Sequence, residues 1–144
     1  DTPAFIANRV GVFGIMALFN SMEKLGLSVE AIDKLSGPLI GRPKSATFRT
    51  CDVVGIDTLV KVAQGVADNC PNDEARELFA LPSFLTQMVA NNWLGDKTGQ
   101  GFYKKSKTPE GKKEILSLNL QTLEYGPQEK VKFPLLDPIK AEDN

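Results

Sequence analysis

The chain has 144 residues, of which 42% are hydrophobic and 24% charged, and these proportions are typical of one globular domain with a single core. A formal net charge of −1 excludes the broad positive surface that nucleic acid or an anionic membrane would attract. We expect neither partner, no membrane-spanning segment and no signal peptide, and hence a cytoplasmic protein.

The chain contains no histidine. A Ser/His or Cys/His nucleophile pair and a histidine-ligated metal site are therefore excluded within this sequence. Cys51 and Cys70 are the only cysteines, too few for a disulfide framework, and we expect both to be buried thiols. Any chemistry that uses imidazole as a general base must take it from outside these residues.

The sequence predicts a long first helix. Thr2 is suited to N-cap it, Pro3 to its first position, and Gly26 to its end. Apolar residues spaced four, three and four apart then form one stripe along the helix: Ile6, Val10, Phe13 and Ala17.

Four shorter helices follow. Ser28 caps a helix through Leu35, and a third helix opens at Ser45 or Thr47 and ends at Gly55. A fourth runs from a cap at residue 57 to residue 70, and a fifth from a cap at residue 83 to about residue 92. The polar connection at residues 72–78 has room for one helical turn. The pattern predicts an all-α domain of about five helices.

The character of the chain changes after Tyr103. Lys104 to Lys113 is polar and rich in lysine, which favours a solvated linker. Residues 114–125 favour an extended segment or one strand, which would dock on a neighbour because a lone strand leaves its edges unpaired. The residues from Gly126 onward are expected to be irregular. We therefore divide the chain into a helical domain, residues 1–103, and a linker with a C-terminal extension, residues 104–144.

Three segments could carry chemistry. Asn8, one turn into the first helix, offers two donors and an acceptor that do not titrate, which suits holding a carbonyl or an imidazole; the alternative is a surface or capping residue. Arg42 and Lys44 lie in a loop fixed by glycine and proline and could contact phosphates, or could be simple surface cations. Residues 97–103 favour a glycine turn anchored by two aromatic residues over a phosphate cradle.

Taken together, these motifs resemble the C-terminal domain of 3-hydroxyacyl-CoA dehydrogenases. Thr2 to Arg9 is similar to the opening signature of that domain. The other matching segments follow in the family's order: Ile32-Asp33-Lys34, Gly41-x-Pro43, Asp52-Val53-Val54-Gly55-Ile56-Asp57 and Gly95-Asp96-Lys97-Thr98-Gly99-Gln100-Gly101-Phe102-Tyr103. The resemblance covers residues 1 to about 103.

The resemblance implies a fold like the C-terminal domain of 6-phosphogluconate dehydrogenase, preceded in the whole enzyme by a Rossmann domain. That upstream domain would bind NAD and supply a His–Glu pair as the base, and acyl-CoA would lie between the domains. The whole enzyme would oxidise (S)-3-hydroxyacyl-CoA to 3-oxoacyl-CoA in fatty-acid β-oxidation. Asn8 would join the active site, and Arg42 and Lys44 would be weaker substrate contacts. The isolated chain should be inactive.

Two departures from the family pattern are informative. Phe13 stands where the family usually has proline or alanine, and the loop at residues 41–50 has one extra residue. That loop and the segment at residues 114–136 resemble long enzymes that fuse the dehydrogenase to an enoyl-CoA hydratase.

Two other interpretations stay open. The chain could be a helical association module without a catalytic role, pairing as a homodimer or with a tandem helical domain. It could also be the helical domain of another β-hydroxyacid dehydrogenase, which would act on a different substrate.

Overall fold

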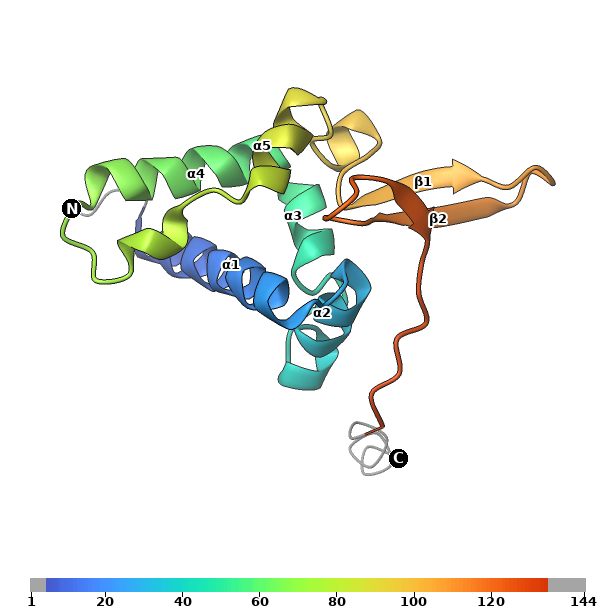
Figure 1. The fold of residues 1–144 in the computed structure, drawn as a ribbon, viewed down its shortest axis with the longest axis horizontal. Coiled ribbons are helices and arrows are strands. Elements are labelled where there is room, and N and C mark those ends of the chain that lie inside the picture. Colours follow the sequence, from blue (N-terminus) through green and yellow to red (C-terminus); the bar gives the residue numbers. More distant parts are fainter. Residues whose placement is uncertain (1–4, 135–144) are drawn as a thin grey trace.

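The computed structural model describes residues 5–134, so Thr2 and Pro3, the expected start of the first helix, lie outside it. Five α-helices are followed by a small antiparallel sheet that projects from the helices (Figure 1). The α-helices are α1 (Phe5–Leu25), α2 (Val29–Leu35), α3 (Phe48–Val54), α4 (Ile56–Asn69) and α5 (Ser83–Ala90). Short 3-10 helices are η1 (Pro38–Ile40), η2 (Arg76–Phe79) and η3 (Asp96–Thr98).

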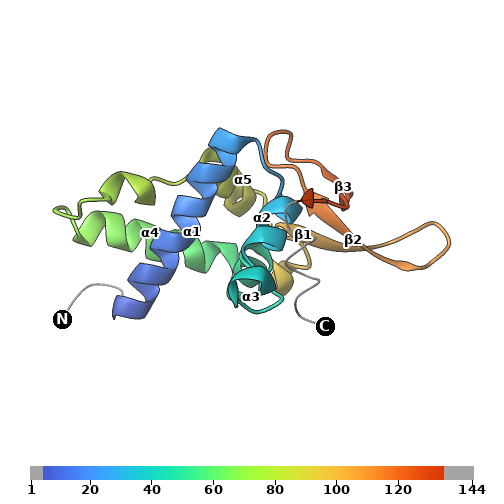
Figure 2. The same ribbon diagram turned by 90° about the horizontal axis from the view of Figure 1, so that it is seen from below.

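The core lies where α1 crosses α4 and where α3, α5 and the sheet meet them (Figure 2). Four phenylalanine rings join these elements, with centroids 4.6 to 6.2 Å apart in tilted, edge-on and stacked pairs. They are Phe19, Phe48, Phe84 and Phe102. Each is at most 3% exposed, so this cluster fixes how the long helices and the turn before the sheet sit together.

The buried face of α1 is not the apolar stripe singled out in the sequence. Its buried residues are Val12, Met16, Phe19 and Met22. Ile6 is 77% exposed and Val10 is 65% exposed. The helix therefore has two apolar faces. One is buried in the core, and the other is largely exposed although its Phe13 lies beside Phe79, so periodicity alone does not say which face is buried.

Most expected helix boundaries agree with the structure. Gly26 follows α1 with φ 62°, and Ser28 caps α2 by accepting the N–H of Ala31 at 3.3 Å. Gly55, with φ 101°, ends α3 as expected. The two later caps are wrong: α4 begins one residue before Asp57, and Ser83 is already the first residue of α5, so neither side chain caps its helix.

The expectation of a solvated linker at residues 104–113 is wrong, because strands begin and end within it. β1 (Tyr103–Lys107) and β2 (Lys113–Leu118) pair in an antiparallel hairpin, and β3 (Tyr125–Pro127) pairs with the other edge of β2. Lysine has little intrinsic preference for strands, so β1 forms because it pairs with β2, and Leu118 of β2 is buried in the core. The docked strand expected within residues 114–125 is confirmed, whereas the expected irregular end is described only to residue 134.

One helix bears on the expectation of no membrane-spanning segment. By length and composition alone, α1 is apolar enough to cross a bilayer. A single helix of this kind is a weak indication, because core helices of water-soluble proteins pass the same test. Met16 and Phe19, in the middle of α1, are fully buried within this fold.

Candidate functional site

Asn8 lies near the start of α1 and is exposed. With Val12, Ile15 and Phe19 it makes a series spaced four, three and four, so all four side chains fall on one line along the helix. Val12 and Phe19 are buried, but at Asn8, one turn earlier, the side chain is in the open. The amide thus continues the inward-facing side of α1 beyond the part that the domain covers.

Arg9 anchors this end of α1. Its guanidinium forms an ion pair with Asp73, in the connection between α4 and η2. The same contact lowers the pKa of Asp73, and a second Asp73 oxygen accepts the N–H of Ala75 at 2.9 Å. The backbone beside Asn8 is therefore held against the α4–η2 connection although the amide itself is free to contact another molecule.

The loop of Arg42 and Lys44 follows η1. Gly41 turns the chain with φ 74°, and both cations are exposed. The Arg42 guanidinium donates to the Thr47 hydroxyl at 3.5 Å, a weak contact. Lys44 instead lines a groove of about 940 Å³ between the helices and the hairpin, which Arg42 does not line.

Asn8 and this loop are not brought together in one copy of the chain. The 17 residue-to-residue steps from Asn8 to Leu25, the end of α1, span about 25 Å at 1.5 Å per step. The loop lies beyond that far end, after α2 (Figures 1 and 2). A single small ligand that touched both would have to cross the length of the helical domain.

Asp33 joins the loop to the sheet. Its carboxylate accepts the N–H groups of Thr47, Phe48 and Arg49, at 2.6 to 3.2 Å, and so caps α3 from a distant part of the chain. The Tyr103 hydroxyl donates to the same carboxylate at 2.8 Å. Thr47 occupies the cap position without capping, so the sequence pattern identified the right residue for the wrong reason.

Asp52 holds the glycine turn in a similar way. Its two oxygens accept the N–H groups of Phe102 and Tyr103 at 2.8 and 2.9 Å. Burial raises the pKa of Asp52 to about 6, against the opposing effect of these two donors. A Cβ atom built on Gly101 would lie 2.1 Å from the Asp52 carboxylate, so only glycine fits there.

These contacts give a structural role to two of the segments that resemble the family, Ile32-Asp33-Lys34 and the segment that begins at Asp52. The turn is structural, as expected: Gly99 has φ 78°, Phe102 is fully buried, and Asp52 uses the N–H groups that a phosphate would need. Sequence reasoning missed the role of Asp33 and Asp52, because an aspartate that caps a distant backbone leaves no local spacing to detect.

The two cysteines differ. Cys51 is buried as expected, and burial raises the pKa of its thiol, whereas Cys70 is only partly buried. Among residues 5–134 no cluster of three or more metal-ligating side chains occurs.

Comparison with known proteins places these features in a family. A model of the family "3-hydroxyacyl-CoA dehydrogenase, C-terminal domain" matches residues 5–105. A probable 3-hydroxyacyl-CoA dehydrogenase of Bacillus subtilis is 51% identical over 140 residues, which are 97% of this chain and 17% of that protein. A putative fatty acid oxidation complex trifunctional enzyme of Rickettsia prowazekii is 30% identical over 91% of this chain and 18% of its own length.

A solved structure gives the same result. The crystal structure of FadB2 from M. tuberculosis matches 71% of this chain and 34% of its own chain, with a TM-score of 0.61 and 28% identity. The chain spans roughly a sixth to a third of the length of these relatives, which therefore carry further domains. With the match over residues 5–105, the chain belongs to the 3-hydroxyacyl-CoA dehydrogenase C-terminal domain family.

Proposed function

We propose that this chain is the helical domain of an NAD-dependent enzyme that oxidises (S)-3-hydroxyacyl-CoA to 3-oxoacyl-CoA in fatty-acid oxidation. The family match over residues 5–105 carries the proposal, and two relatives are named for this chemistry or for fatty acid oxidation. Fusion to an enoyl-CoA hydratase and a cytoplasmic location stay predictions. The choice of 3-hydroxyacyl-CoA over another β-hydroxyacid rests on the names of the relatives.

The described residues do not fit NAD. A dinucleotide site needs a strand, a glycine-rich turn and a helix in a parallel βαβ unit. Within residues 5–134 the only sheet is antiparallel. The backbone N–H groups of the glycine turn before it already donate to the Asp52 carboxylate. In this proposal NAD and the imidazole base belong to another domain of a longer protein, and this chain contributes one wall of the acyl-CoA cleft.

Asn8 is the residue proposed to reach the substrate. Its exposed amide can donate to the substrate's C3 oxygen or orient the imidazole of the other domain. The Arg9–Asp73 ion pair fixes the helix turn that carries it, so the donor is positioned before the substrate arrives. A pre-positioned donor of this kind stabilises developing charge on an oxygen without reorganisation.

The test is Asn8→Ala in the full-length protein. Losing one positioned donor costs about 10²–10³ in rate, and we expect the lower end in kcat because other groups share the task. Asn20→Ala is the matched control: it is on the same helix about three turns away, and its amide donates to the Met16 carbonyl at 2.9 Å. NADH formation at 340 nm reports both variants. Unchanged kcat and KM in Asn8→Ala would remove Asn8 from the site.

A second assay tests whether the base and the cofactor site lie in another domain. The 144-residue chain, given 3-hydroxybutyryl-CoA and NAD, should form no NADH, because it contains no histidine. Adding the separately produced Rossmann domain should restore measurable turnover. Robust turnover by the chain alone would show that the base and the cofactor site lie within it.

The exposed face of α1 favours a second role, association with another domain or another copy. Near Asn8, four apolar side chains are 40 to 77% exposed: Phe5, Ile6, Val10 and Phe13. Several large apolar side chains exposed on one stretch of helix favour a contact with another protein surface. This role adds to the catalytic one, because the same end of α1 would then carry both Asn8 and the contact.

A further inference from the structure

The chain that leaves β3 runs along α2 (Figure 1). The N–H of Glu129 donates to the Glu30 carboxylate at 3.1 Å, in the first turn of α2. Lys34, in the last turn, donates to the Val131 carbonyl, and its ammonium lies 5.9 Å from the centre of the Phe133 ring. This part of the chain therefore follows one face of α2 from its start to its end, toward η1.

The groove beside Lys44 lies along the same path. Lys34 belongs to its lining, and so do Pro38 and Leu39 of η1. Its volume of about 940 Å³ is near the upper end of the range for pockets that bind small molecules. The groove has room for several side chains, and a chain that continues past residue 134 in the same direction reaches it.

The unpaired charge in the groove is positive. Both carboxylates of the lining are used within the domain: Asp33 accepts three backbone N–H groups and the Tyr103 hydroxyl, and Asp96 is held by both terminal nitrogens of Arg49 at 2.9 Å. Lys44 makes no ion pair within the described part of the chain. An occupant with a carboxylate at Lys44 would complement this charge.

The groove also exposes apolar surface. Pro38 of η1 is exposed, and its neighbour Ile40 is 62% exposed. Across the groove, Ile115 of the hairpin is 50% exposed. An occupant that covered this surface with apolar side chains would gain the free energy of burying them.

Burial alternates along the last described residues. Val131 and Phe133 are half-buried, whereas Lys132 and Pro134 are exposed. Alternation of this kind is the pattern of an extended chain, in which every second side chain points to the same side. The side that faces the domain is therefore fixed before the described chain ends.

The residues that follow have suitable side chains. Carried on by two and four residues, the alternation predicts that Leu135 and Asp137 face the domain and that Leu136 faces away. Pro138 restricts Asp137 to an extended conformation, so less conformational entropy is lost on docking. Leu135 suits the apolar surface at η1, and Asp137 supplies a carboxylate for Lys44.

We propose that residues 135–139 of this chain dock in the groove, with Leu135 on Leu39 and Asp137 paired with Lys44. The docked segment holds the chain against the domain from β3 to η1. In a longer protein, such as the relatives above, whatever follows then starts beside the loop of Lys44 and not at the sheet. The groove thus sets the position of the next domain, whatever reaction that protein catalyses.

The test is NMR spectroscopy of the isotope-labelled 144-residue chain. The parent should show nuclear Overhauser contacts from Leu135 to Leu39, and the backbone relaxation of residues 135–139 should match that of the folded domain. Leu135→Ser should abolish the contacts and release the segment. Leu136→Ser is the matched control and should leave both unchanged. Unchanged amide shifts of the four core phenylalanines will report that each variant is folded.

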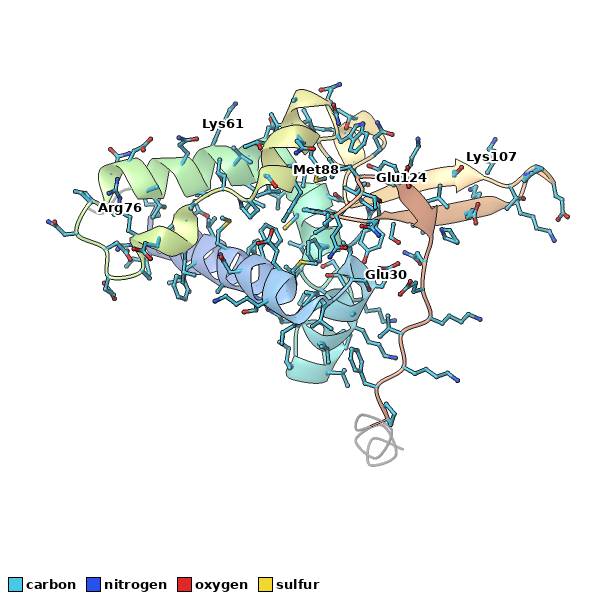
Figure 3. All side chains as sticks on the ribbon, viewed as in Figure 1. Glu30, Lys61, Arg76, Met88, Lys107 and Glu124 are labelled. Atoms are coloured by element: carbon cyan, nitrogen blue, oxygen red, sulfur yellow. The ribbon has the colours of Figure 1, made fainter. Side chains whose placement is uncertain are left out.

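A charge exchange tests the ion pair. Lys44→Asp and Asp137→Lys should each lose the contacts between the segment and η1, and the double variant should regain them. Lys61→Asp is the control: Lys61 is exposed on α4 and does not line the groove (Figure 3), so this variant should keep the contacts.

Several results would overturn the proposal. One is the absence of contacts between residues 135–139 and η1 in the parent. Equal losses in Leu136→Ser or Lys61→Asp, or contacts that survive both single charge reversals, would also contradict it. A mixture of differently labelled chains separates the remaining case: contacts found only between copies would make a second copy the occupant. The NADH assays do not enter this test, so the two proposals can fail independently.

Discussion

The two ends of the helical domain are built differently. At the junction of α3 with the glycine turn, Asp33 and Asp52 accept five backbone N–H groups and one phenol, so both carboxylates are used within the domain. At the start of α1, Asn8 and several apolar side chains are exposed. The Arg9–Asp73 ion pair holds this end of the helix against the α4–η2 connection.

This difference separates residues that make the fold from residues that are available for function. Both ends contain segments that match the family, so resemblance alone does not distinguish them. A substitution at the junction should change stability, whereas one at the start of α1 should change catalysis or association and leave stability nearly unchanged. The variants below test that division, from the largest expected loss of stability to the smallest.

Gly101→Ala should cause the largest loss. The added Cβ would lie 2.1 Å from the Asp52 carboxylate and 2.6 Å from the Gly95 Cα, and neither neighbour can move without breaking the turn. We expect a loss of about 3 kcal/mol or more in the free energy of unfolding, as for an overpacked core. Urea unfolding followed by circular dichroism measures it.

Gly65→Ala is the matched control for that variant. Gly65 lies inside α4, and a Cβ built there meets no atom within 4 Å. Alanine is about 1 kcal/mol better than glycine in a helix interior, so this variant should be as stable as the parent or more so. Equal losses in the two variants would contradict the account of the junction.

Asp52→Asn should be the next most damaging, with a characteristic pH dependence. An amide can accept only one of the two N–H groups, and the other would face an NH₂ donor, at a cost of about 1–3 kcal/mol. The wild-type carboxyl, with its pKa raised to about 6, binds its proton more tightly in the folded state than in the unfolded state. Its contribution to stability is therefore full below about pH 4 and is lost as pH rises through 6.

The advantage of the parent over Asp52→Asn should consequently be smaller at pH 7 than at pH 4. Asp57→Asn provides the opposite sign at lower pH. Lys97 lowers the pKa of Asp57, so the contribution of this carboxylate is full above about pH 4 and is lost as pH falls below that. A flat difference between parent and Asp52→Asn across this range would show that the two backbone donors offset the effect of burial.

The sequence predicted the helices well and the contacts between distant segments poorly. Gly26, Ser28 and Gly55 mark boundaries through local conformation, so their signals are local and were found. β1 was missed because its lysines favour a strand only once β2 is beside it. For the site, the sequence indicated Asn8 by resemblance, but the groove beside Lys44 unites α2 with the hairpin 70 residues later, a juxtaposition that no spacing reveals.

Arg9→Ala should have a small effect on stability. The guanidinium is partly exposed and its ion pair with Asp73 is screened by salt, so the loss should be small and should fade in 1 M salt, where the Debye length is about 3 Å. Lys112→Ala, which breaks the exposed pair with Glu110, should have no measurable effect at either salt concentration. In the full-length protein Arg9→Ala should also lower kcat, since the turn that carries Asn8 is less firmly held.

Val10→Ser should have the smallest effect on stability and the clearest effect on association. Val10 is 65% exposed, whereas Val12, two residues along the same helix, is 7% exposed, so the pair samples both faces of α1. Val12→Ser should cost about 1.5–3 kcal/mol, the value for removing a buried valine side chain, and Val10→Ser should cost almost nothing. Sedimentation at increasing concentration should show less self-association, and less binding of an apolar dye, for Val10→Ser than for the parent. If Val10→Ser instead unfolds as readily as Val12→Ser, the face of α1 that carries Val10 belongs to the core. If Val10→Ser leaves association and dye binding unchanged, the exposed apolar residues of α1 are not a contact surface.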